Sequence, residues 1–151
     1  ADDSSGDALE QALIAAGHCL QDRQLVADDR YAIRAVLSAW ITDLAVQVVI
    51  TSGGTGLTGR DGTPEAVAPL LDKTIDGFGE LFRVLSFETI GTSTLQSRCL
   101  AGVANGTIVF VLPGSLDAVT TAWDRLIAAQ LNPDTRPCNL VQLLPRLREP
   151  S

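Results

Sequence analysis

Two short apolar runs constrain the fold of this chain more than any other feature of its sequence. Residues 46–51 (VQVVIT) and 107–112 (TIVFVL) are rich in β-branched side chains and nearly continuous in apolarity. Runs of this length and composition are typical of strands that are covered on both faces. Each run leads through a glycine-containing loop into a segment with helical spacing. The pattern therefore predicts an α/β fold, a three-layer αβα domain with a mostly parallel central sheet.

Apolar residues spaced three and four apart predict the surrounding helices. The clearest lies at 32–41, directly after Asp28 and Asp29, either of which can serve as its N-cap. Other helices are expected at 4–17, 63–71, 78–85, 93–104 and 115–127, and a weak strand of mixed polarity at 18–26. We therefore expect residues 1–131 to form the α/β domain. The proline-containing segment 132–151 is expected to extend from it and to pack on the domain or on a neighbouring subunit.

The charge balance excludes several classes of partner. The chain has 11 Lys and Arg against 18 Asp and Glu, a formal net charge of -7, which argues against binding to nucleic acid or to an anionic membrane surface. Its apolar runs are far shorter than the ~18 residues that a membrane span needs. Three cysteines without CxxC spacing favour neither a disulfide framework nor a zinc site, and indicate a reducing, cytoplasmic location. An anionic ligand would need local help from backbone amides, a metal ion or a few arginines.

The first functional candidate is the loop at 52–61 (SGGTGLTGRD), which follows the first apolar run and precedes a helix. Its glycines allow backbone amides to point inward and hold phosphate oxygens without side-chain charge. The GxxxxGK[ST] spacing of phosphate-binding ATPases fits from Gly54 to Gly59, but Arg60 and Asp61 stand where Lys and Ser or Thr are required. The GxGxxG spacing of dinucleotide-binding loops is matched, which is a weak signal by itself. The alternative is a flexible turn that binds nothing.

The second candidate is the loop of Leu112, Pro113, Gly114 and Ser115, which joins the other apolar run to a helix. Alone, this loop would be interpreted as ordinary helix capping. Parallel strands, however, end at the same edge of a sheet, where ligands bind in α/β folds. Two such loops could therefore clasp one ligand.

Several motifs, all in the same order, resemble those of a known family. They are SGGTGLTGRDGTPEA at 52–66, GFGELFR at 77–83, IGTSTLQSR at 90–98 and LPGS at 112–115. Together they resemble the MoaB/MogA family, which has the molybdopterin-binding fold of molybdenum cofactor biosynthesis, and within it the B branch. The resemblance runs from residue 4 to residue 139. One departure is at the start: family members open with a strand reading roughly V-L-T-V-S-D, and we expect that strand to precede this sequence, which has no methionine.

The resemblance implies a reaction, the transfer of AMP from Mg-ATP to the terminal phosphate of molybdopterin with release of pyrophosphate. Such a site needs a divalent metal and fixed donors, because several negative charges meet around the α-phosphorus. The family assembles as trimers, and in the B branch often as hexamers, so a homo-oligomer is expected. The main alternative is a protein of the same fold that binds molybdopterin without catalysis. Unrelated nucleotide binding at the edge of the sheet is a third possibility.

The resemblance also assigns site residues to positions of this sequence. Asp28 and Asp61 would act as the catalytic acids and would hold Mg²⁺ through phosphate oxygens and water. The nucleotide and the substrate would lie against Gly53, Gly54, Thr55, Gly56, Thr63, Ser97, Arg98, Pro113, Gly114 and Ser115. Plainer structural roles are the alternatives for three of these positions: Asp28 as a helix N-cap, Asp61 as a loop cap, and Arg98 as a solvated side chain after a capping serine.

Overall fold

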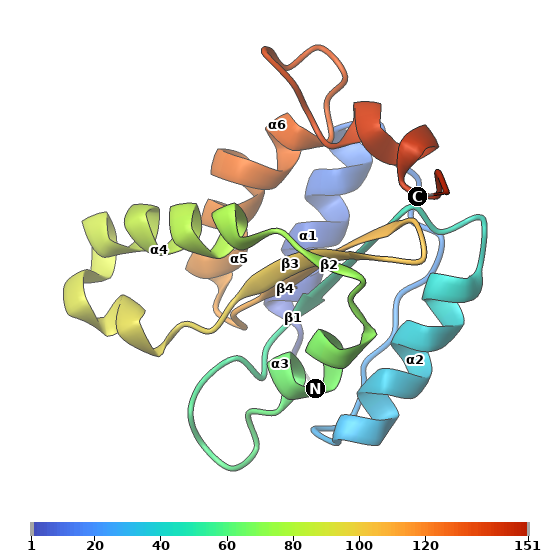
Figure 1. Ribbon diagram of the computed structural model, residues 1–151. Helices are drawn as coiled ribbons and strands as arrows, with labels where there is room; N and C mark the ends of the chain where they lie inside the picture. The colour runs from blue at the N-terminus through green and yellow to red at the C-terminus, as the bar shows by residue number, and fades with distance from the viewer. Residues whose placement is uncertain (1, 151) are drawn as a thin grey trace.

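A four-stranded sheet with the strand order β1–β4–β3–β2 runs through the computed structural model, which describes residues 2–150 (Figure 1). The strands are β1 (Val48–Ser52), β2 (Lys73–Thr74), β3 (Leu100–Ala104) and β4 (Thr107–Leu112). β1 runs parallel to β4, whereas β3 is antiparallel to both β4 and β2. The α/β class is confirmed, but the sheet is mixed rather than mostly parallel. The reason is that β3 and β4 form a hairpin, which forces antiparallel pairing.

Helices cover both faces of this sheet and complete the three layers (Figure 1). They are α1 (Ser4–Ala15), α2 (Arg30–Thr42), α3 (Thr63–Val67), α4 (Asp76–Ile90), α5 (Leu116–Ala122) and α6 (Ala128–Gln130), with 3-10 turns at Ala68–Leu70, Gly91–Gln96 and Val141–Arg146. A π-helical turn, Trp123–Ile127, joins α5 to α6, so the two continue as one helical segment. Residues 1 and 151, the outer ends of the two segments expected from the sequence, lie outside the described residues.

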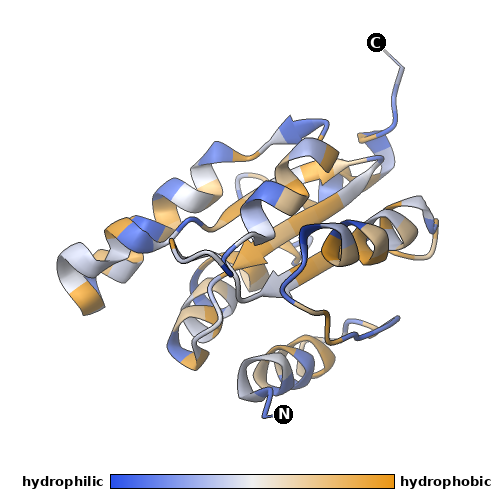
Figure 2. Cartoon of the chain, turned by 90° about the horizontal axis from the view of Figure 1, so that it is seen from below, coloured by the Kyte–Doolittle hydropathy of each residue, from blue (hydrophilic) through white to orange (hydrophobic). Residues whose placement is uncertain are grey.

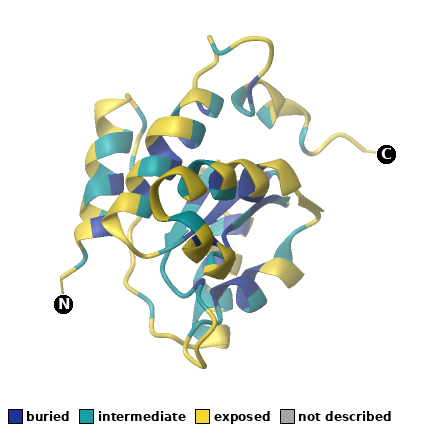
Figure 3. Cartoon of the chain, turned by 90° about the vertical axis from the view of Figure 1, so that its left-hand side faces the viewer, coloured by how far each residue is buried: buried dark blue, intermediate teal, exposed yellow. Residues whose placement is uncertain are grey.

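The central strand β4 divides the core into two halves, because successive side chains of a strand point to opposite faces. Ile108, Phe110 and Leu112 pack with α1, α4 and α5. Val109 and Val111 pack with α2 and α3 on the other face. Figure 2 shows the central strands in orange between helices of mixed hydropathy, and Figure 3 shows the buried residues gathered around the sheet. Every residue of β4 is buried, which explains why its sequence is apolar without alternation.

Side-chain caps fix the starts of three helices. The Asp3 carboxylate accepts from the Gly6 amide (3.1 Å), that of Asp29 from the Ala32 amide (2.8 Å), and the Ser115 hydroxyl from the Ala118 amide (3.1 Å). Each bond satisfies an amide that has no partner within its own helix. Asp29, not Asp28, is therefore the N-cap of α2, and the capping role considered for Asp28 is filled by its neighbour.

Two expected elements are wrong. The helix expected at 93–104 is a 3-10 turn followed by β3, and β3 turns into β4 through Asn105 and Gly106, both with positive φ (48° and 80°). This is the two-residue hairpin turn that Asn-Gly favours. The strand expected at 18–26 is also absent, since residues 18–27 have no regular secondary structure. Arg23 instead ties this segment to α1 through the carboxylates of Asp3 (2.8 Å) and Asp7 (2.9 Å).

The C-terminal segment returns to the domain after α6. The Leu140 amide donates to the Gln130 carbonyl at 3.0 Å. Leu140, Val141, Leu144 and Leu147 then pack against the core half that contains α1, α4 and α5. Among residues 2–150, every helix is too short or too polar to cross a membrane.

Candidate functional site

Two loops meet at the ends of β1 and β4. The parallel register places Ser52 opposite Leu112, the last residues of the two strands. The Gly53 amide then donates to the Leu112 carbonyl at 2.9 Å. The following loop approaches so closely that a Cβ atom on Gly114 would lie 3.1 Å from the Gly53 Cα. The glycine loop at 52–61 and the loop at 113–115 therefore lie side by side at one edge of the sheet.

Glycine is required at the start of the first loop. Gly53 and Gly54 have φ values of 99° and 73°, a region that side chains with a Cβ rarely adopt. A Cβ on Gly54 would also lie 2.2 Å from the Thr63 Oγ1. The Thr63 amide donates to the Gly54 carbonyl at 3.1 Å, and Thr55 and Thr63 are both buried. The glycines thus let the chain fold tightly against the start of α3.

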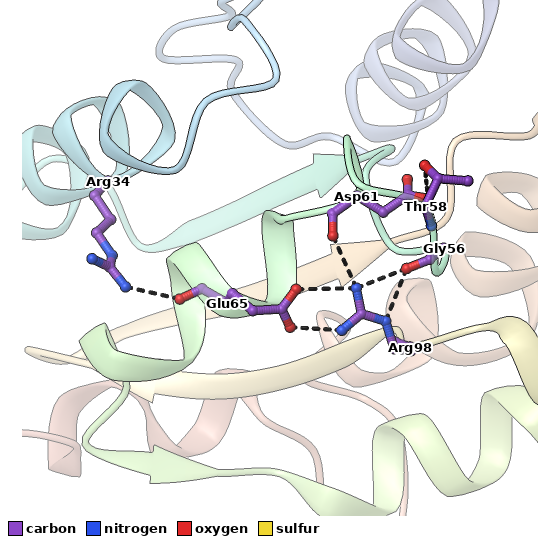
Figure 4. A network of polar contacts seen from close by, with 6 residues as sticks. All are labelled: Arg34, Gly56, Thr58, Asp61, Glu65 and Arg98. Atoms are coloured by element: carbon purple, nitrogen blue, oxygen red, sulfur yellow. Dashed lines mark hydrogen bonds and ion pairs between the residues drawn. The ribbon is translucent and has the colours of Figure 1, made fainter.

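Arg98 holds the middle of the same loop from the side of β3 (Figure 4). Its Nε and Nη2 donate to the Gly56 carbonyl at 2.9 and 2.7 Å, and Nη2 donates to the Asp61 carbonyl at 3.1 Å. Nη1 and Nη2 also bind the Glu65 carboxylate at 2.6 and 3.1 Å. The planar guanidinium has five N–H groups, so these contacts leave at most one of them free. The role suggested for Arg98, contact with a phosphate, stays a prediction.

A second arginine secures α3 from behind. Arg34 of α2 donates from Nε to the Ala66 carbonyl and from Nη2 to the Glu65 carbonyl, both at 2.9 Å (Figure 4). These carbonyls belong to the last turn of a five-residue helix and have few partners within it. Glu65 is therefore held through its backbone by Arg34 and through its side chain by Arg98.

These contacts set the ionisation of two carboxylates. Hydrogen bonds from Arg98 lower the pKa of Glu65 below its ordinary 4.5, and the same pairing raises the pKa of Arg98. The Asp61 Oδ2 accepts from the Thr58 hydroxyl at 2.8 Å and from the Thr58 amide at 2.9 Å. These bonds, the hydroxyl first, lower the pKa of Asp61 below its ordinary 3.8. Both side chains are therefore charged at neutral pH.

A cleft of about 440 Å³ runs along β1 and ends at the glycine loop. Asp28, Thr51, Ser52, Gly53 and Thr63 line it there, whereas Asp61 does not line it. The structure thus brings Asp28 to the start of the glycine loop and turns the Asp61 side chain toward Thr58 in the same loop.

The donor set fits a cation that takes oxygen ligands. Mg²⁺ commonly uses one or two protein carboxylates and completes its shell with water and phosphate. Thr58 binds only the Oδ2 atom of Asp61, the Gly56 amide contributes to its lowered pKa, and Asp28 is exposed. Within the same residues, no three His, Cys, Asp or Glu side chains gather as a metal cluster. The chain therefore offers two acidic side chains for a metal that a phosphate ligand would help to bind.

Some polar groups of the site were not anticipated from the sequence. The Thr51 Oγ1 and Ser97 Oγ are buried and lack a hydrogen-bond partner among the described residues. Ser97 was expected at the site, but Thr51 was not. Its signal is a polar side chain at the end of an otherwise apolar strand that leads into glycines. Glu65 and Arg34 were also missed, because their partners are distant in sequence.

A sheet covered on both faces, with two ligand-type loops at the ends of neighbouring parallel strands, defines a ligand-binding α/β domain. The family model with the description "Probable molybdopterin binding domain" matches residues 1–133. Molybdenum cofactor biosynthesis protein B of Escherichia coli (strain K12) is 57% identical over 138 residues, which cover 91% of this chain and 81% of that relative. The chain therefore belongs to the MoaB/MogA family of molybdopterin-binding domains. Its role lies in molybdenum cofactor biosynthesis.

Solved structures agree with this family. A crystal structure of a molybdenum cofactor biosynthesis protein B has a TM-score of 0.82 and 45% identity, covering 85% of this chain and 81% of that one. The tungsten cofactor synthesizing protein MoaB from Pyrococcus furiosus has a TM-score of 0.75 and 33% identity, covering 99% of this chain and 88% of that one. The similarity thus extends over most of the chain.

Proposed function

We propose that this protein binds molybdopterin and adenylylates it with Mg-ATP. An oxygen of the terminal phosphate of molybdopterin attacks the α-phosphorus of ATP, the bond to the β-phosphate bridging oxygen breaks, and pyrophosphate leaves. The observation that carries the proposal is the meeting of the loops 52–61 and 113–115 at the ends of β1 and β4, where Ser52 and Gly53 line a cleft together with Asp28. This arrangement supplies backbone amides and a carboxylate at one place.

The phosphates are bound mainly by backbone groups in this proposal. A chain with a net charge of -7 repels an anion at long range, so donors must be concentrated at the binding site. The amides of Gly54, Thr55 and Gly56 supply them, while Gly53 shapes the turn through its own bond to the Leu112 carbonyl, with Thr63 beneath the loop and Ser97 to one side. Pro113, Gly114 and Ser115 form the facing rim.

Asp28 and Asp61 are proposed as the acidic residues of the site, with Mg²⁺ as their cation. The metal would neutralise charge that develops on the phosphate oxygens. Asp61 is ionised at neutral pH, as a metal-binding carboxylate must be. Asp28 lies at the end of the segment 18–28, beside the loop that would hold the phosphates.

The test is direct assay of the product. Purified protein is incubated with molybdopterin and Mg-ATP, and adenylylated pterin and pyrophosphate are measured. Asp61→Asn and Asp28→Asn should each lower product formation at least about a hundredfold, since each removes a charge that stabilises the reacting phosphates. Asp124→Asn, an exposed residue of the π-helical turn, is the matched control and should react as the unaltered protein does. Equal turnover by Asp61→Asn would remove that residue from the mechanism.

One observation favours a second function, binding of molybdopterin without catalysis. Asp61 does not line the cleft that Asp28 lines, so the two acids are not assembled around one cavity. A binding protein would retain molybdopterin in equilibrium dialysis, would form no adenylylated product, and would bind it equally well with and without Mg-ATP.

We further propose that the protein works in the cytoplasm as a homo-oligomer, a trimer or a hexamer. Its three cysteines are free thiols, as a reducing compartment maintains them. The outer face of α4 and the turn after it expose Leu81, Val84, Phe87, Ile90 and Leu95, a larger group of apolar side chains than a monomer usually leaves in water.

Mass in solution, measured by light scattering, tests the oligomer and this face together. The unaltered chain should have three or six times the mass of the monomer, and a Val84→Glu, Phe87→Glu double variant should be monomeric with an unchanged circular dichroism spectrum. A Leu44→Glu variant, exposed on the turn after α2, is the control and should keep the larger mass.

A further inference from the structure

The contacts of Arg98 determine which way the backbone amides of the glycine loop point. Arg98 binds the carbonyl oxygens of Gly56 and Asp61, near the two ends of the same turn (Figure 4). In a trans peptide the carbonyl and the following N–H point in opposite directions, and the one cis peptide in residues 2–150 is far away, before Pro137. The N–H groups of Leu57 and Gly62 are therefore turned away from the guanidinium. Neither donates a hydrogen bond to a described residue.

The charge of Arg98 is already matched inside the protein. The Glu65 carboxylate binds two nitrogens of the guanidinium at 2.6 and 3.1 Å, and such a paired contact fixes the plane of an arginine as well as neutralising it. Arg34 in turn fixes the backbone of Glu65. An anionic ligand that approached Arg98 would have to compete with a carboxylate held in place on both sides.

We infer that Arg98 and Glu65 form a positioning pair. They hold the backbone carbonyls of the loop 56–62, so that the amides of this loop stay turned toward the phosphates of ATP. Neither side chain contacts the nucleotide. This role deepens the proposed function and rests on it for the identity of the ligand. The positioning role and direct contact of Arg98 with phosphate predict opposite effects on nucleotide binding when the charge of Glu65 is removed. If Arg98 bound phosphate itself, removing the charge of Glu65 would free the guanidinium and strengthen nucleotide binding. If Arg98 positions the loop, the same change weakens binding.

Four single variants and one double variant separate the two roles. Glu65→Gln, Arg98→Lys and Arg98→Met alter the pair, and Arg146→Met breaks the exposed Arg146–Glu149 pair of the C-terminal segment as the matched control. Binding of Mg-ATP is measured by calorimetry, and KM and kcat are measured separately for both substrates. The positioning role predicts that Glu65→Gln, Arg98→Lys and Arg98→Met each weaken Mg-ATP binding about tenfold or more. The Glu65→Gln, Arg98→Met double variant should bind Mg-ATP no more weakly than Arg98→Met does. The KM for molybdopterin should be unchanged in all of them. Tighter binding by Glu65→Gln, or near-normal binding by Arg98→Lys, would overturn it.

A measurement without nucleotide keeps this inference distinct from the proposed function. Amide hydrogen exchange of the free protein at Asp61 and Thr63, whose amides donate to the Thr58 and Gly54 carbonyls at 3.0 and 3.1 Å, should accelerate in Glu65→Gln and Arg98→Lys and stay unchanged in Arg146→Met. If the unaltered protein binds no Mg-ATP, the proposed function is contradicted. If amide exchange in Glu65→Gln and Arg98→Lys is as slow as in the unaltered protein, the positioning role is contradicted. If Arg98→Met does not fold, Glu65→Gln and Arg98→Lys decide the question through both readouts, because each retains a polar side chain of nearly the same size.

Discussion

Position 54 meets two requirements that only a glycine satisfies together. Its φ of 73° disfavours a side chain, and the Thr63 Oγ1 occupies the place where a Cβ would lie. Gly17 has a similar φ of 89° at the end of α1 but faces open space. Alanine substitutions at the two positions therefore separate the effect of backbone strain from that of steric overlap.

Gly54→Ala should lower the free energy of unfolding by about 2–3 kcal/mol, and Gly17→Ala by about 1 kcal/mol, because only the first variant adds overlap to strain. Urea unfolding followed by circular dichroism measures both. Equal losses would show that the contact with Thr63 is relieved at no cost.

The hydroxyl of Thr58 controls the acidity of Asp61. Thr58→Val removes the strongest bond to the Asp61 carboxylate and keeps the size of the side chain, so the pKa of Asp61 should rise toward its ordinary 3.8. Carbon-detected NMR titration of the carboxyl group measures the change. Thr120→Val, an exposed position on α5, should leave that titration unaltered. An unchanged titration in Thr58→Val would assign the low pKa to the backbone amides of the loop.

The candidate site could be predicted from the sequence where it depends on local backbone. The glycines of loop 52–61 and the sequence Pro113-Gly114-Ser115 indicate turns at the ends of strands, and this signal does not depend on tertiary contacts. The pairing of Glu65 with Arg98 could not be predicted, because 33 residues separate them and only the packing of α3 beside β3 brings them together. Asp28 was a candidate for two roles, and only the cap made by Asp29 decided which of the two residues begins α2.

At the scale of elements, β4 organises the core. Phe110 is 2% exposed and packs edge to face on Phe78 of α4, with 5.2 Å between the ring centres. Phe110→Ala should lower the free energy of unfolding by about 3–5 kcal/mol, since it removes a buried ring and leaves a cavity. Leu44→Ala, at a side chain 76% exposed, should change it by less than about 0.5 kcal/mol. A loss below about 2 kcal/mol for Phe110→Ala would mean that α4 collapses into the space.

The elements that were predicted correctly are indicated by patterns within their own sequence. The wrong predictions concern segments whose structure depends on pairing with another strand. Helix α2 has an apolar stripe and a cap in its own sequence. β3 is a strand because the turn at Asn105 and Gly106 folds it back along β4, a signal present in the sequence as Asn-Gly between apolar segments. Residues 18–27 have the composition of a weak strand but pair with no strand in the described structure, so they have no regular secondary structure.

Acid should weaken the whole molecule through carboxylates that are bound in the folded state. The pKa values of Asp61 and Glu65 are lowered on folding, so the unfolded chain takes up protons at a higher pH than the folded one. Their contribution to stability is complete above the unfolded pKa values of 3.8 and 4.5 and is lost as the pH falls through the lower folded values. Arg98 stays charged throughout this range.

The free energy of unfolding should therefore be nearly level from pH 7 to about pH 5.5 and should fall steadily below about pH 4.5. Urea unfolding at a series of pH values measures this dependence. Glu65→Gln should be less stable at neutral pH and should show a shallower acid loss, because one of the titrating groups is removed. A variant curve parallel to that of the unaltered protein would show that Glu65 does not contribute.

The segment at 18–28 joins two helices that belong to different layers. Arg23 binds it to the carboxylates of α1, and the Asp22 carboxylate accepts a hydrogen bond from the Trp40 indole of α2 at 3.0 Å. Asp28 lies six residues beyond Asp22 on the same unpaired stretch. Trp40 also lines the cleft that Asp28 lines, so we expect a ligand in that cleft to change the fluorescence of Trp40. Trp123, buried in the π-helical turn, lines the same cleft, so a Trp40→Phe variant is needed to separate its signal from that of Trp40.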